Sequence, residues 1–306
     1  MAFLYALEEI RFPAFTALMS ALTYLGDELC FIAIALLFFW CINKRQAYFI
    51  FCVGLAGSIV NQFLKLCFRI PRPWVLDPDF TIVESAREAA SGYSFPSGHT
   101  QNAAGTFGAI AMSANKKWLR SVCILLMLIV AFSRMYLGVH TPRDIAVSFL
   151  VAAVLLCIFY PVFKSDSNAF RRALAAMFAV ILLSALYMLF ILFNDFPADI
   201  DPHNLASGTK NAYTFMGSLL GLLLAMVIDN KYINFDTKAP LIGQILKYAL
   251  GLALVVAVKS LLKAPLNAVF SGGQLANLVR YFLMVVFAGC VWPLTFPFFA
   301  GIGKKK

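Results

Sequence analysis

The feature that most limits the fold of this chain is a succession of long apolar runs joined by short polar connections. A helix that crosses the hydrocarbon core of a bilayer needs about 20 mostly apolar residues, and lipid-facing backbone must satisfy its hydrogen bonds within its own segment. The sequence therefore predicts an all-α, polytopic membrane bundle of about nine transmembrane helices. The spans are expected near residues 28–42, 47–68, 99–115, 119–137, 143–163, 172–193, 211–229, 239–262 and 276–300.

Composition supports a membrane location. Of the 306 residues, 61% are hydrophobic and 13% are charged, with a mean hydropathy of +0.82. Soluble domains average roughly 45–50% apolar and about 25% charged residues. Residues 1–25 differ from the rest, because Glu8, Glu9 and Arg11 interrupt the apolar pattern and Pro13 follows. We expect an interfacial helix there, and the missing basic start and small-residue cleavage site argue against a signal peptide.

The net charge of +10 does not indicate a nucleic-acid partner, because the basic residues fall in connections between the apolar runs. Such a distribution is typical of the positive-inside bias. In the nine-span count, one side of the membrane carries most of these cations: Lys44, Arg45, Lys116, Lys117, Arg120, Lys164, Arg171, Arg172 and Lys304 to Lys306. That side is expected to be cytoplasmic. The amino terminus and the connections 69–98 and 138–142 then lie outside, and the carboxyl terminus lies inside.

Neither a metal site nor a disulfide framework is indicated. The seven cysteines lie in or beside apolar runs, are odd in number and show no CxxC spacing, so we interpret them as small buried hydrophobes. Asp199, Asp201 and His203 alternate in a polar connection and are the only arrangement that suggests a cation. An acidic, solvated loop is the better interpretation of them, and we predict no metal and no other cofactor.

Three polar clusters stand out against this apolar background. The first is KLCFRIPRP, residues 65–73, at the end of the second predicted span. Pro71 and Pro73 must end the helix and hold Arg72 in an extended conformation. Lys65 and Arg69 lie one turn apart. Snorkelling of basic side chains to the headgroups would explain this cluster by itself.

The second cluster is PSGH, residues 96–99. Ser97 can cap a helix that starts here, and Gly98 allows backbone to approach a ligand closely. The amino terminus of a helix with this chemistry is suited to anions. A well-capped transmembrane helix would explain Pro96 and Ser97 equally well. It does not explain His99, since the helix terminus disfavours an imidazolium nearby.

The third cluster is SRMYLGVHTPRD, residues 133–144. Thr141 and Pro142 predict a helix start, at which Asp144 could serve as an ordinary capping-box acid. That account leaves Arg134 and His140 unexplained. Asp144 is four residues after His140, so its carboxylate could hold one ring nitrogen and leave the other as an unprotonated nucleophile. Arg134 is a charge near the end of a predicted span, where a functional role is the default hypothesis.

The three clusters are expected on one outer face, and together they contain two of the three histidines of the chain. Capping or snorkelling has to be invoked separately for each cluster, whereas one bound phosphate explains all of them. In order along the chain, the residues read Lys65-x6-Arg72-Pro73, Pro96-Ser97-Gly98-His99 and Ser133-Arg134-x5-His140-x3-Asp144.

This arrangement resembles the three-part signature of the type 2 phosphatidic acid phosphatase superfamily, in the same order and with every part matched. The resemblance covers roughly residues 25–165. Ser148 departs slightly, because glycine is common there in the family, but a small residue is kept. The resemblance implies a six-helix catalytic core at 26–193, preceded by the interfacial helix at 1–25. Residues 194–306 would then add three transmembrane helices and outer loops.

Similarity to the family also implies a mechanism. His140 would attack phosphorus and form a phosphohistidine, with Asp144 orienting its ring. His99 would protonate the leaving oxygen and then activate the water that cleaves the intermediate. No metal is needed in this scheme, because protein cations supply the positive charge.

The phosphate oxygens would be held by Lys65, Arg72 and Arg134, together with Ser97 and the backbone amide of Gly98. Stabilisation of charge on these oxygens is the main part of phosphoryl-transfer catalysis. A site at the outer edge of the membrane suits a lipid phosphate or diphosphate that enters from the bilayer. Undecaprenyl diphosphate, phosphatidate and phosphatidylglycerol phosphate all fit this description.

Several alternatives stay open at the level of sequence. A glucose-6-phosphatase-like sugar phosphatase would share the nine spans and the outward site, and a lipid phosphotransferase would share the motifs. A non-catalytic relative that binds or transports phospholipid is a third alternative. The soluble haloperoxidases of the superfamily are excluded by the predicted spans. The absence of an Asn-x-Ser/Thr site favours a bacterial plasma membrane, and the oligomeric state is not indicated.

Three cations late in the chain form a further candidate site. Lys259 and Lys263 are one turn apart at the end of the eighth predicted span, and Arg280 begins the ninth on the same side. The positive-inside bias does not favour cations there. Snorkelling is the simpler explanation, and a second anion site, for a distal phosphate or a lipid headgroup, is the alternative.

Overall fold

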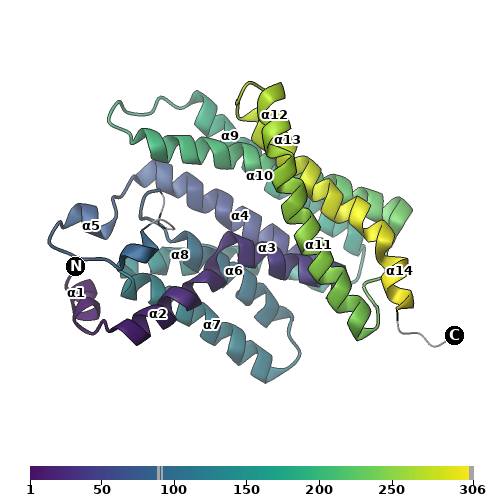
Figure 1. The fold of residues 1–306 in the computed structure, drawn as a ribbon, viewed down its shortest axis with the longest axis horizontal. Coiled ribbons are helices and arrows are strands. Elements are labelled where there is room, and N and C mark those ends of the chain that lie inside the picture. The colour runs from purple at the N-terminus through teal and green to yellow at the C-terminus, as the bar shows by residue number, and fades with distance from the viewer. Residues whose placement is uncertain (88–89, 91, 303–306) are drawn as a thin grey trace. The chain divides into compact units, whose positions relative to one another are not determined.

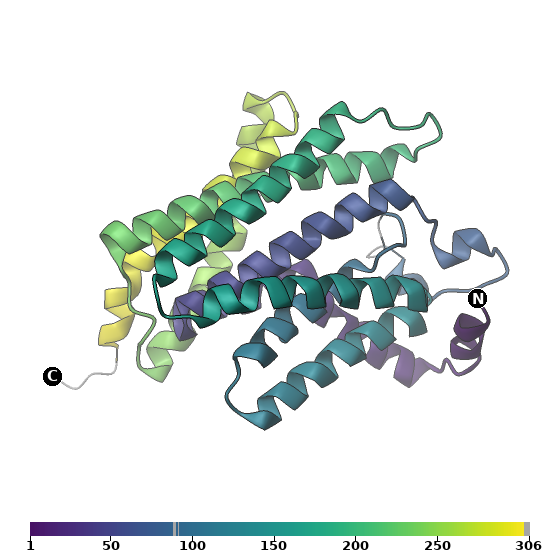
Figure 2. The ribbon, with the colours of Figure 1, turned by 180° about the vertical axis from the view of Figure 1, so that it is seen from behind.

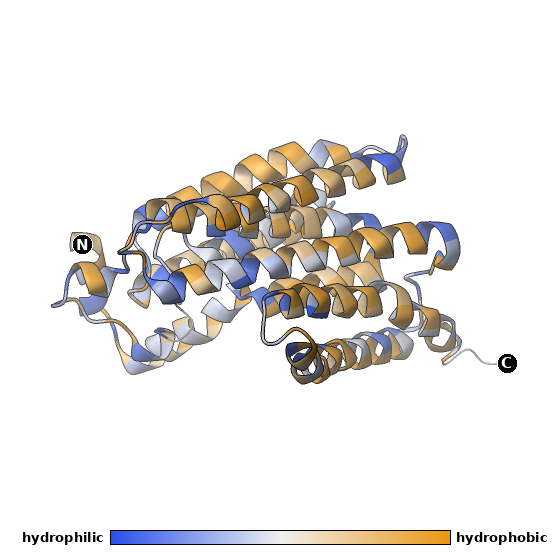
Figure 3. Ribbon diagram, turned by 90° about the horizontal axis from the view of Figure 1, so that it is seen from above, coloured by the Kyte–Doolittle hydropathy of each residue, from blue (hydrophilic) through white to orange (hydrophobic). Residues whose placement is uncertain are grey.

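The computed structural model describes residues 1–87, 90 and 92–302, and these form helices and connections without a β-strand (Figure 1). The expected all-α fold is confirmed. Figure 3 shows that the helices are mainly hydrophobic and that polar residues gather largely at their ends and connections. Of the sequence predictions, the cations Lys304 to Lys306 and residues 88, 89 and 91 of the predicted connection 69–98 lie outside the described residues.

The chain divides into two compact units that interleave along the sequence. The first unit comprises residues 1–32, 49–164 and 195–208. The elements that begin in it are α1 (Ala2–Glu9), α2 (Pro13–Leu22), η1 (Thr23–Gly26), α3 (Glu28–Leu37), α5 (Pro73–Leu76), η3 (Glu84–Ala86), α6 (Gly98–Ser113), α7 (Lys117–Tyr136), α8 (Pro142–Lys164) and α10 (Pro202–Ile228).

The second unit comprises residues 33–48, 165–194 and 209–306. The elements that begin in it are η2 (Phe38–Ile42), α4 (Lys44–Phe68), α9 (Ala169–Phe193), η4 (Asp229–Ile233), α11 (Leu241–Leu261), α12 (Lys263–Val269), α13 (Leu275–Val286), η5 (Phe287–Val291), η6 (Trp292–Thr295) and α14 (Phe296–Gly301). Figure 2 shows the same elements from behind. Helices α3, α4 and α10 each contribute to both units.

The number of spans differs from the predicted nine. Seven helical segments among the described residues are long and apolar enough to cross a membrane, or eight if the bent pair Pro13–Gly26 and Glu28–Ile42 is one span. The two halves of that pair meet at an angle of 55°. The segment predicted at 99–115 is the helix α6, which has only 16 residues. At about 1.5 Å per residue, this helix is shorter than a typical hydrocarbon core.

The first 25 residues form two helices and a short 3₁₀ turn in place of the single expected helix. Leu4, Leu7 and Met19 are buried, so this region packs against protein. Arg11 lies in the break between α1 and α2, and its guanidinium donates to the carbonyl oxygens of Tyr136 and Thr81 at 2.9 and 2.8 Å. Arg11, which interrupts the apolar pattern of the sequence, therefore connects the break between α1 and α2 to the end of α7.

Within the first unit, α6 packs along both α7 and α8. The connection between α4 and α6 lies against the end of α7, where Val83 donates to the carbonyl of Leu137 at 3.1 Å. A cluster that includes Met19, Ala86, Tyr136 and Val139 fills the space beneath it. This packing brings the three polar clusters of the sequence into one region.

Candidate active site

The start of α6 is built as the sequence predicts. Ser97 precedes the helix in an extended conformation, and its hydroxyl accepts from the amide of Thr100 at 3.4 Å. A methyl group added at Gly98 would meet its nearest neighbour, Asn61 Oδ1, at 3.8 Å. Packing within the chain therefore does not require a glycine at 98, and space remains in front of the helix terminus. The first amides of a helix lack intrahelical acceptors and can bind an anion there.

His140 follows the end of α7 because of the backbone at Gly138. That glycine has φ +82°, and a methyl group there would lie 2.8 Å from the Arg11 guanidinium. Both the left-handed backbone and the close contact favour glycine at this helix end. The chain then turns so that His140 is buried, with 2% of its side chain exposed, directly before α8.

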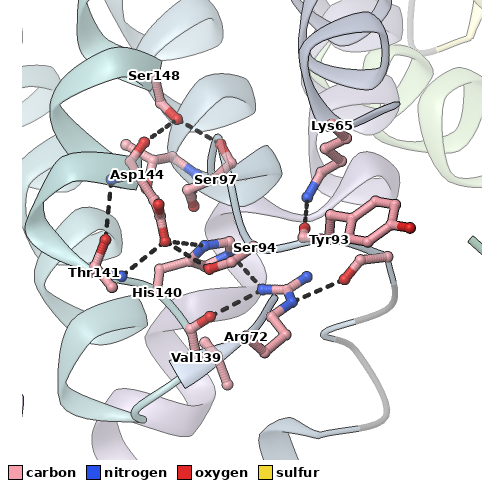
Figure 4. Close-up of polar contacts among 12 residues, drawn as sticks. Lys65, Arg72, Tyr93, Ser94, Ser97, Val139, His140, Thr141, Asp144 and Ser148 are labelled. Carbon is pink, nitrogen blue, oxygen red and sulfur yellow. Dashed lines mark hydrogen bonds and ion pairs between the residues drawn. The ribbon is translucent and has the colours of Figure 1, made fainter. Parts of the chain in front are cut away.

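Asp144 performs two tasks in the structure. Its Oδ2 accepts from the amide of Thr141 at 2.9 Å, and its own amide donates to the Thr141 hydroxyl at 3.4 Å. This is the reciprocal capping box expected from the sequence. The same Oδ2 lies 3.4 Å from His140 Nδ1, a long contact (Figure 4). The capping role and the orienting role are therefore compatible.

Two serines support this arrangement. Ser94 donates its hydroxyl to Asp144 Oδ2 at 2.6 Å. Ser148 donates to the carbonyl oxygens of Ser97 and Asp144 at 2.9 and 2.8 Å, which joins α8 to the start of α6. A hydroxyl at 148, where glycine is common in the family, therefore has a structural use here. Sequence reasoning did not identify Ser94, although it lies two residues before the PSGH cluster.

Arg72 contacts the other nitrogen of His140. Its Nη1 lies 3.0 Å from His140 Nε2 and donates to the carbonyl of Val139 at 2.9 Å, while its Nε donates to the carbonyl of Gly92 at 2.9 Å. Arg72 is extended, as the flanking prolines predict, and Arg69 ends the preceding helix in a left-handed conformation. Figure 4 shows the guanidinium beside the imidazole.

Lys65 and Arg134 add two further buried cations. Lys65 donates to the carbonyl of Tyr93 and is 6% exposed. Arg134 is fully buried, and its Nη1 donates to the Thr23 hydroxyl at 2.9 Å. Its Nε and Nη2 have no hydrogen-bond partner among the described residues. Neither Lys65 nor Arg134 forms an ion pair within the described chain. Buried, uncompensated cations of this kind fit an anionic ligand.

Burial and the same three cations act on both histidines. Burial, and next the neighbouring Arg72, lower the pKa of His140 well below its usual value, which favours a neutral ring. His99 stands among the same cations, with Arg134, Arg72 and Lys65 all acting on it. Its Nε2 lies 3.9 Å from Asp27 Oδ2. Asp27 and Thr23 are the other residues that sequence reasoning did not find.

The remaining candidates have different surroundings. Asp201 accepts from the amide of Asn204 at 2.8 Å, which is a helix cap at the start of α10. Over the described part of the chain, no group of three or more His, Cys, Asp or Glu side chains is placed to hold a metal ion. In the second unit, Lys259 and Arg280 both face the ring of Tyr281, at 5.3 and 5.4 Å from its centroid. Lys263 is exposed.

The fold and the site thus define a helical membrane protein with a buried, cation-lined polar site that contains two histidines. Comparison with known families identifies its class. The PAP2 superfamily model matches residues 45–167, and the model of the PAP2 superfamily phosphatase transmembrane extension matches residues 213–304. The chain belongs to the PAP2 superfamily.

Similar proteins include phosphatases of different organisms. Undecaprenyl-diphosphatase BcrC of Bacillus subtilis is 30% identical over 39% of this chain and 58% of its own length. Phosphatidylglycerophosphatase B of Bacillus subtilis is 29% identical over 48% of this chain and 74% of its own length. Sphingosine-1-phosphate phosphatase 1 of Mus musculus is 26% identical over 79% and 58%, respectively. The match to the first of these relatives therefore spans little more than half of its length. No solved structure matches the chain at a significant level.

Proposed function

We propose that the protein hydrolyses a lipid phosphate or diphosphate through a phosphohistidine on His140. The observation that carries this proposal is the placement of His140 between two partners, with Nδ1 facing Asp144 at 3.4 Å and Nε2 facing Arg72 at 3.0 Å. A ring that faces a carboxylate on Nδ1 presents its Nε2 lone pair. A phosphate that enters the site would bind the Arg72 guanidinium in place of His140. The Nε2 lone pair would then be free to attack phosphorus.

Two steps follow from this arrangement. In the first, the bond between His140 Nε2 and phosphorus forms as the bond to the leaving oxygen breaks, and His99 gives its proton to that oxygen. In the second, His99 takes a proton from water as the water oxygen attacks phosphorus and the bond to His140 breaks. Lys65, Arg72, Arg134, Ser97 and the Gly98 amide would bind the phosphoryl oxygens throughout. Inorganic phosphate and a neutral His140 remain.

The substrate class is inferred from the membrane fold and the relatives. The relatives named above act on undecaprenyl diphosphate, phosphatidylglycerophosphate and sphingosine 1-phosphate, as their names state. All three are phosphorylated lipids, which favours a lipid over a sugar phosphate for this chain. The two Bacillus relatives and the absence of an Asn-x-Ser/Thr site support a bacterial plasma membrane. We place the active site and the amino terminus outside on the positive-inside argument.

The test is a phosphate-release panel on purified protein in detergent with EDTA present. The panel contains the three lipids above, phosphatidate and glucose 6-phosphate. We expect metal-independent release from at least one lipid, little from glucose 6-phosphate, and inhibition by vanadate, which takes the trigonal bipyramidal geometry of the transition state. Transfer of the phosphate to another lipid without free phosphate would indicate a phosphotransferase. A strict requirement for magnesium, or no turnover of any substrate, would reject the proposal.

A second anion site is proposed in the second unit. Arg280 is 7% exposed, and its Nη2 donates to Asn277 Oδ1 at 2.7 Å. Its Nε is buried without a hydrogen-bond partner among the described residues, and the guanidinium shares the Tyr281 ring with Lys259. Snorkelling predicts side chains that reach the headgroups, which suits the exposed Lys263 but not the buried Arg280. A phosphate of the substrate or of a lipid headgroup would compensate these charges.

A further inference from the structure

The segment TYLGD, residues 23–27, contacts the proposed catalytic residues although it precedes the region that the PAP2 superfamily model matches. It consists of η1 and the residue that follows, at the bend between α2 and α3. A methyl group added at Gly26 would lie 2.6 Å from the carbonyl oxygen of His99. The backbone of this segment therefore lies directly on the backbone of His99, and a side chain at 26 would push the two apart.

The same segment contacts a second residue of the site. The hydroxyl of Thr23 accepts from Arg134 Nη1 at 2.9 Å, and Thr23 is itself 6% exposed. This is the one hydrogen bond that the Arg134 guanidinium makes within the described chain, because its Nε and Nη2 are unpartnered. The hydrogen bond fixes one edge of the guanidinium and leaves the other edge for a ligand.

Asp27 divides its carboxylate between two neighbours. Oδ1 accepts from the amide of Leu29 at 2.8 Å, which caps the start of α3. Oδ2 lies 3.9 Å from His99 Nε2. That distance is too long for a hydrogen bond, so the carboxylate is placed to act on a protonated imidazole through charge alone. The same carboxylate also acts on the charge of Arg134. The cap uses one oxygen only, and it does not account for the position of the other.

His99 needs such a partner because of what surrounds it. Arg134 of α7, Arg72 before α5 and Lys65 of α4 all oppose a positive charge on its ring. The α6 terminus does the same. A general acid must nevertheless carry a proton when the leaving oxygen departs, and it must regain one from water in the second step. Asp27 is the negative group that faces it.

We propose that Asp27 is a positioning residue that stabilises the protonated form of His99, and that the segment Thr23–Asp27 is part of the active site. This inference rests on the proposed phosphatase function and deepens it. During the first step the proton moves from His99 to the leaving oxygen, and during the second it moves from water to His99. Asp27 takes no part in either proton transfer.

The two roles of Asp27 can be separated by D27N. Asparagine keeps an oxygen that can accept from the Leu29 amide, so the cap persists, but the charge is lost. The variant is assayed with a lipid that the wild type cleaves, over a pH series. We expect the alkaline limb of the kcat profile to move down by about one pH unit, which is about a tenfold loss on that limb. KM should change little, because the phosphate is held by other groups. A soluble aryl phosphate, whose leaving group needs less protonation, should be affected less.

D77N is the matched control. Asp77 lies in the same unit and is also half-buried. One of its oxygens accepts from the amide of Asp79 at 3.3 Å and the other from the Tyr5 hydroxyl at 3.0 Å. It has no contact with either histidine among the described residues, so its pH profile should equal that of the wild type. D27A, which removes the cap as well, should lower thermal stability in addition to shifting the profile.

A D27N profile identical to that of the wild type would overturn the inference and leave Asp27 as a helix cap. A loss of kcat that is equal at every pH and for both leaving groups would also overturn it, since that is the signature of a general structural defect. Failure of the wild type to release phosphate from any substrate is a different result, because it rejects the proposed function itself.

Discussion

The two histidine regions of the site are built differently. His140 is 2% exposed, with Arg72 Nη1 at 3.0 Å from its Nε2 and Asp144 Oδ2 at 3.4 Å from its Nδ1. Asp144 is itself held by Ser94 and Thr141. His99 is 15% exposed, and Asp27, at 3.9 Å, is 32% exposed. One region is fully buried with a close contact at each ring nitrogen, whereas the other is partly exposed and faces a carboxylate only at a longer distance.

This difference fits two different tasks. A nucleophile must be aligned with phosphorus before reaction, so rigid partners on both sides of His140 serve it. An acid and base must exchange protons with a leaving group and then with water, so partial access to His99 serves that role. The comparison predicts that changes around His140 affect chemistry with every substrate, whereas changes around His99 depend on pH and on the leaving group.

The largest expected effect comes from removing the two imidazoles separately. H140A should abolish phosphate release with every substrate, since no other group can form the intermediate. H99A should retain a trace of activity that is seen only with good leaving groups, at a loss of about 10²- to 10⁴-fold for lipids. Release of inorganic phosphate from a lipid and from an aryl phosphate measures both. Similar residual activity in the two variants, independent of the leaving group, would contradict the assignment of His140 as nucleophile and His99 as acid.

D144N tests the rigid partner of His140. Asparagine can still accept from the Thr141 amide and so retain the capping box, but it no longer stabilises the imidazole as charge develops. We expect kcat to fall on the order of 10³- to 10⁴-fold, as for a carboxylate that orients a catalytic histidine, with little change in thermal unfolding. A loss below about tenfold would show that the contact at 3.4 Å serves helix capping alone.

S94A tests the support behind that carboxylate. The Ser94 hydroxyl donates to Asp144 Oδ2 at 2.6 Å, and removing a buried donor costs about 1–3 kcal/mol. If loss of this hydrogen bond disturbs the orientation of Asp144 and therefore of His140, kcat should fall by roughly tenfold. The control is S121A, because the exposed Ser121 on α7 donates only to the carbonyl of Lys117. Equal kinetics of S94A and S121A would contradict the proposed support.

The smallest effect is expected in the second unit. Neutralising Lys259, Lys263 and Arg280 together should raise KM for a diphosphate by several-fold, about 1 kcal/mol of lost binding, and leave KM for a monophosphate nearly unchanged. The value of kcat should hold, because such contacts bind ground and transition states alike. K210Q, a single neutralisation elsewhere, serves as a control for lost surface charge. Equal changes in KM with both substrates, or no change, would contradict the second anion site and favour the interpretation that the three cations snorkel to the headgroups.

Local features of the site could be predicted from the sequence. The prolines around Arg72, the serine before α6 and the Thr141–Asp144 pair all act on neighbouring backbone, and the structure contains each of them. The all-α fold could also be predicted, because long apolar segments in a membrane must satisfy their backbone hydrogen bonds internally, as helices do. The predicted count of about nine spans is close to the seven or eight candidates among the described residues, and part of the difference is the segment 99–115, which forms the short helix α6.

Other parts of the site could not be read from the sequence. Ser94 meets a partner 50 residues away, and Thr23 meets one 111 residues away. Neither residue is distinguished by its neighbours in sequence, and Asp27 looks like an ordinary helix cap. Their roles depend on how α6, α7 and the bend before α3 pack together, which no local pattern specifies. The prediction of one interfacial helix at 1–25 placed Thr23 at the membrane surface, so its contact with Arg134 was not expected.

The central claim is that His140 carries the phosphoryl group, and trapping that group tests it most directly. Protein is mixed with a ³²P-labelled lipid substrate, quenched in alkali, where phosphohistidine is stable, and digested to locate the label. We expect label on the peptide that contains His140. More label should accumulate in H99A, because hydrolysis of the intermediate is slowed, and none should be found in H140A. Label that persists on the H140A protein, or activity without any labelled peptide, would contradict it.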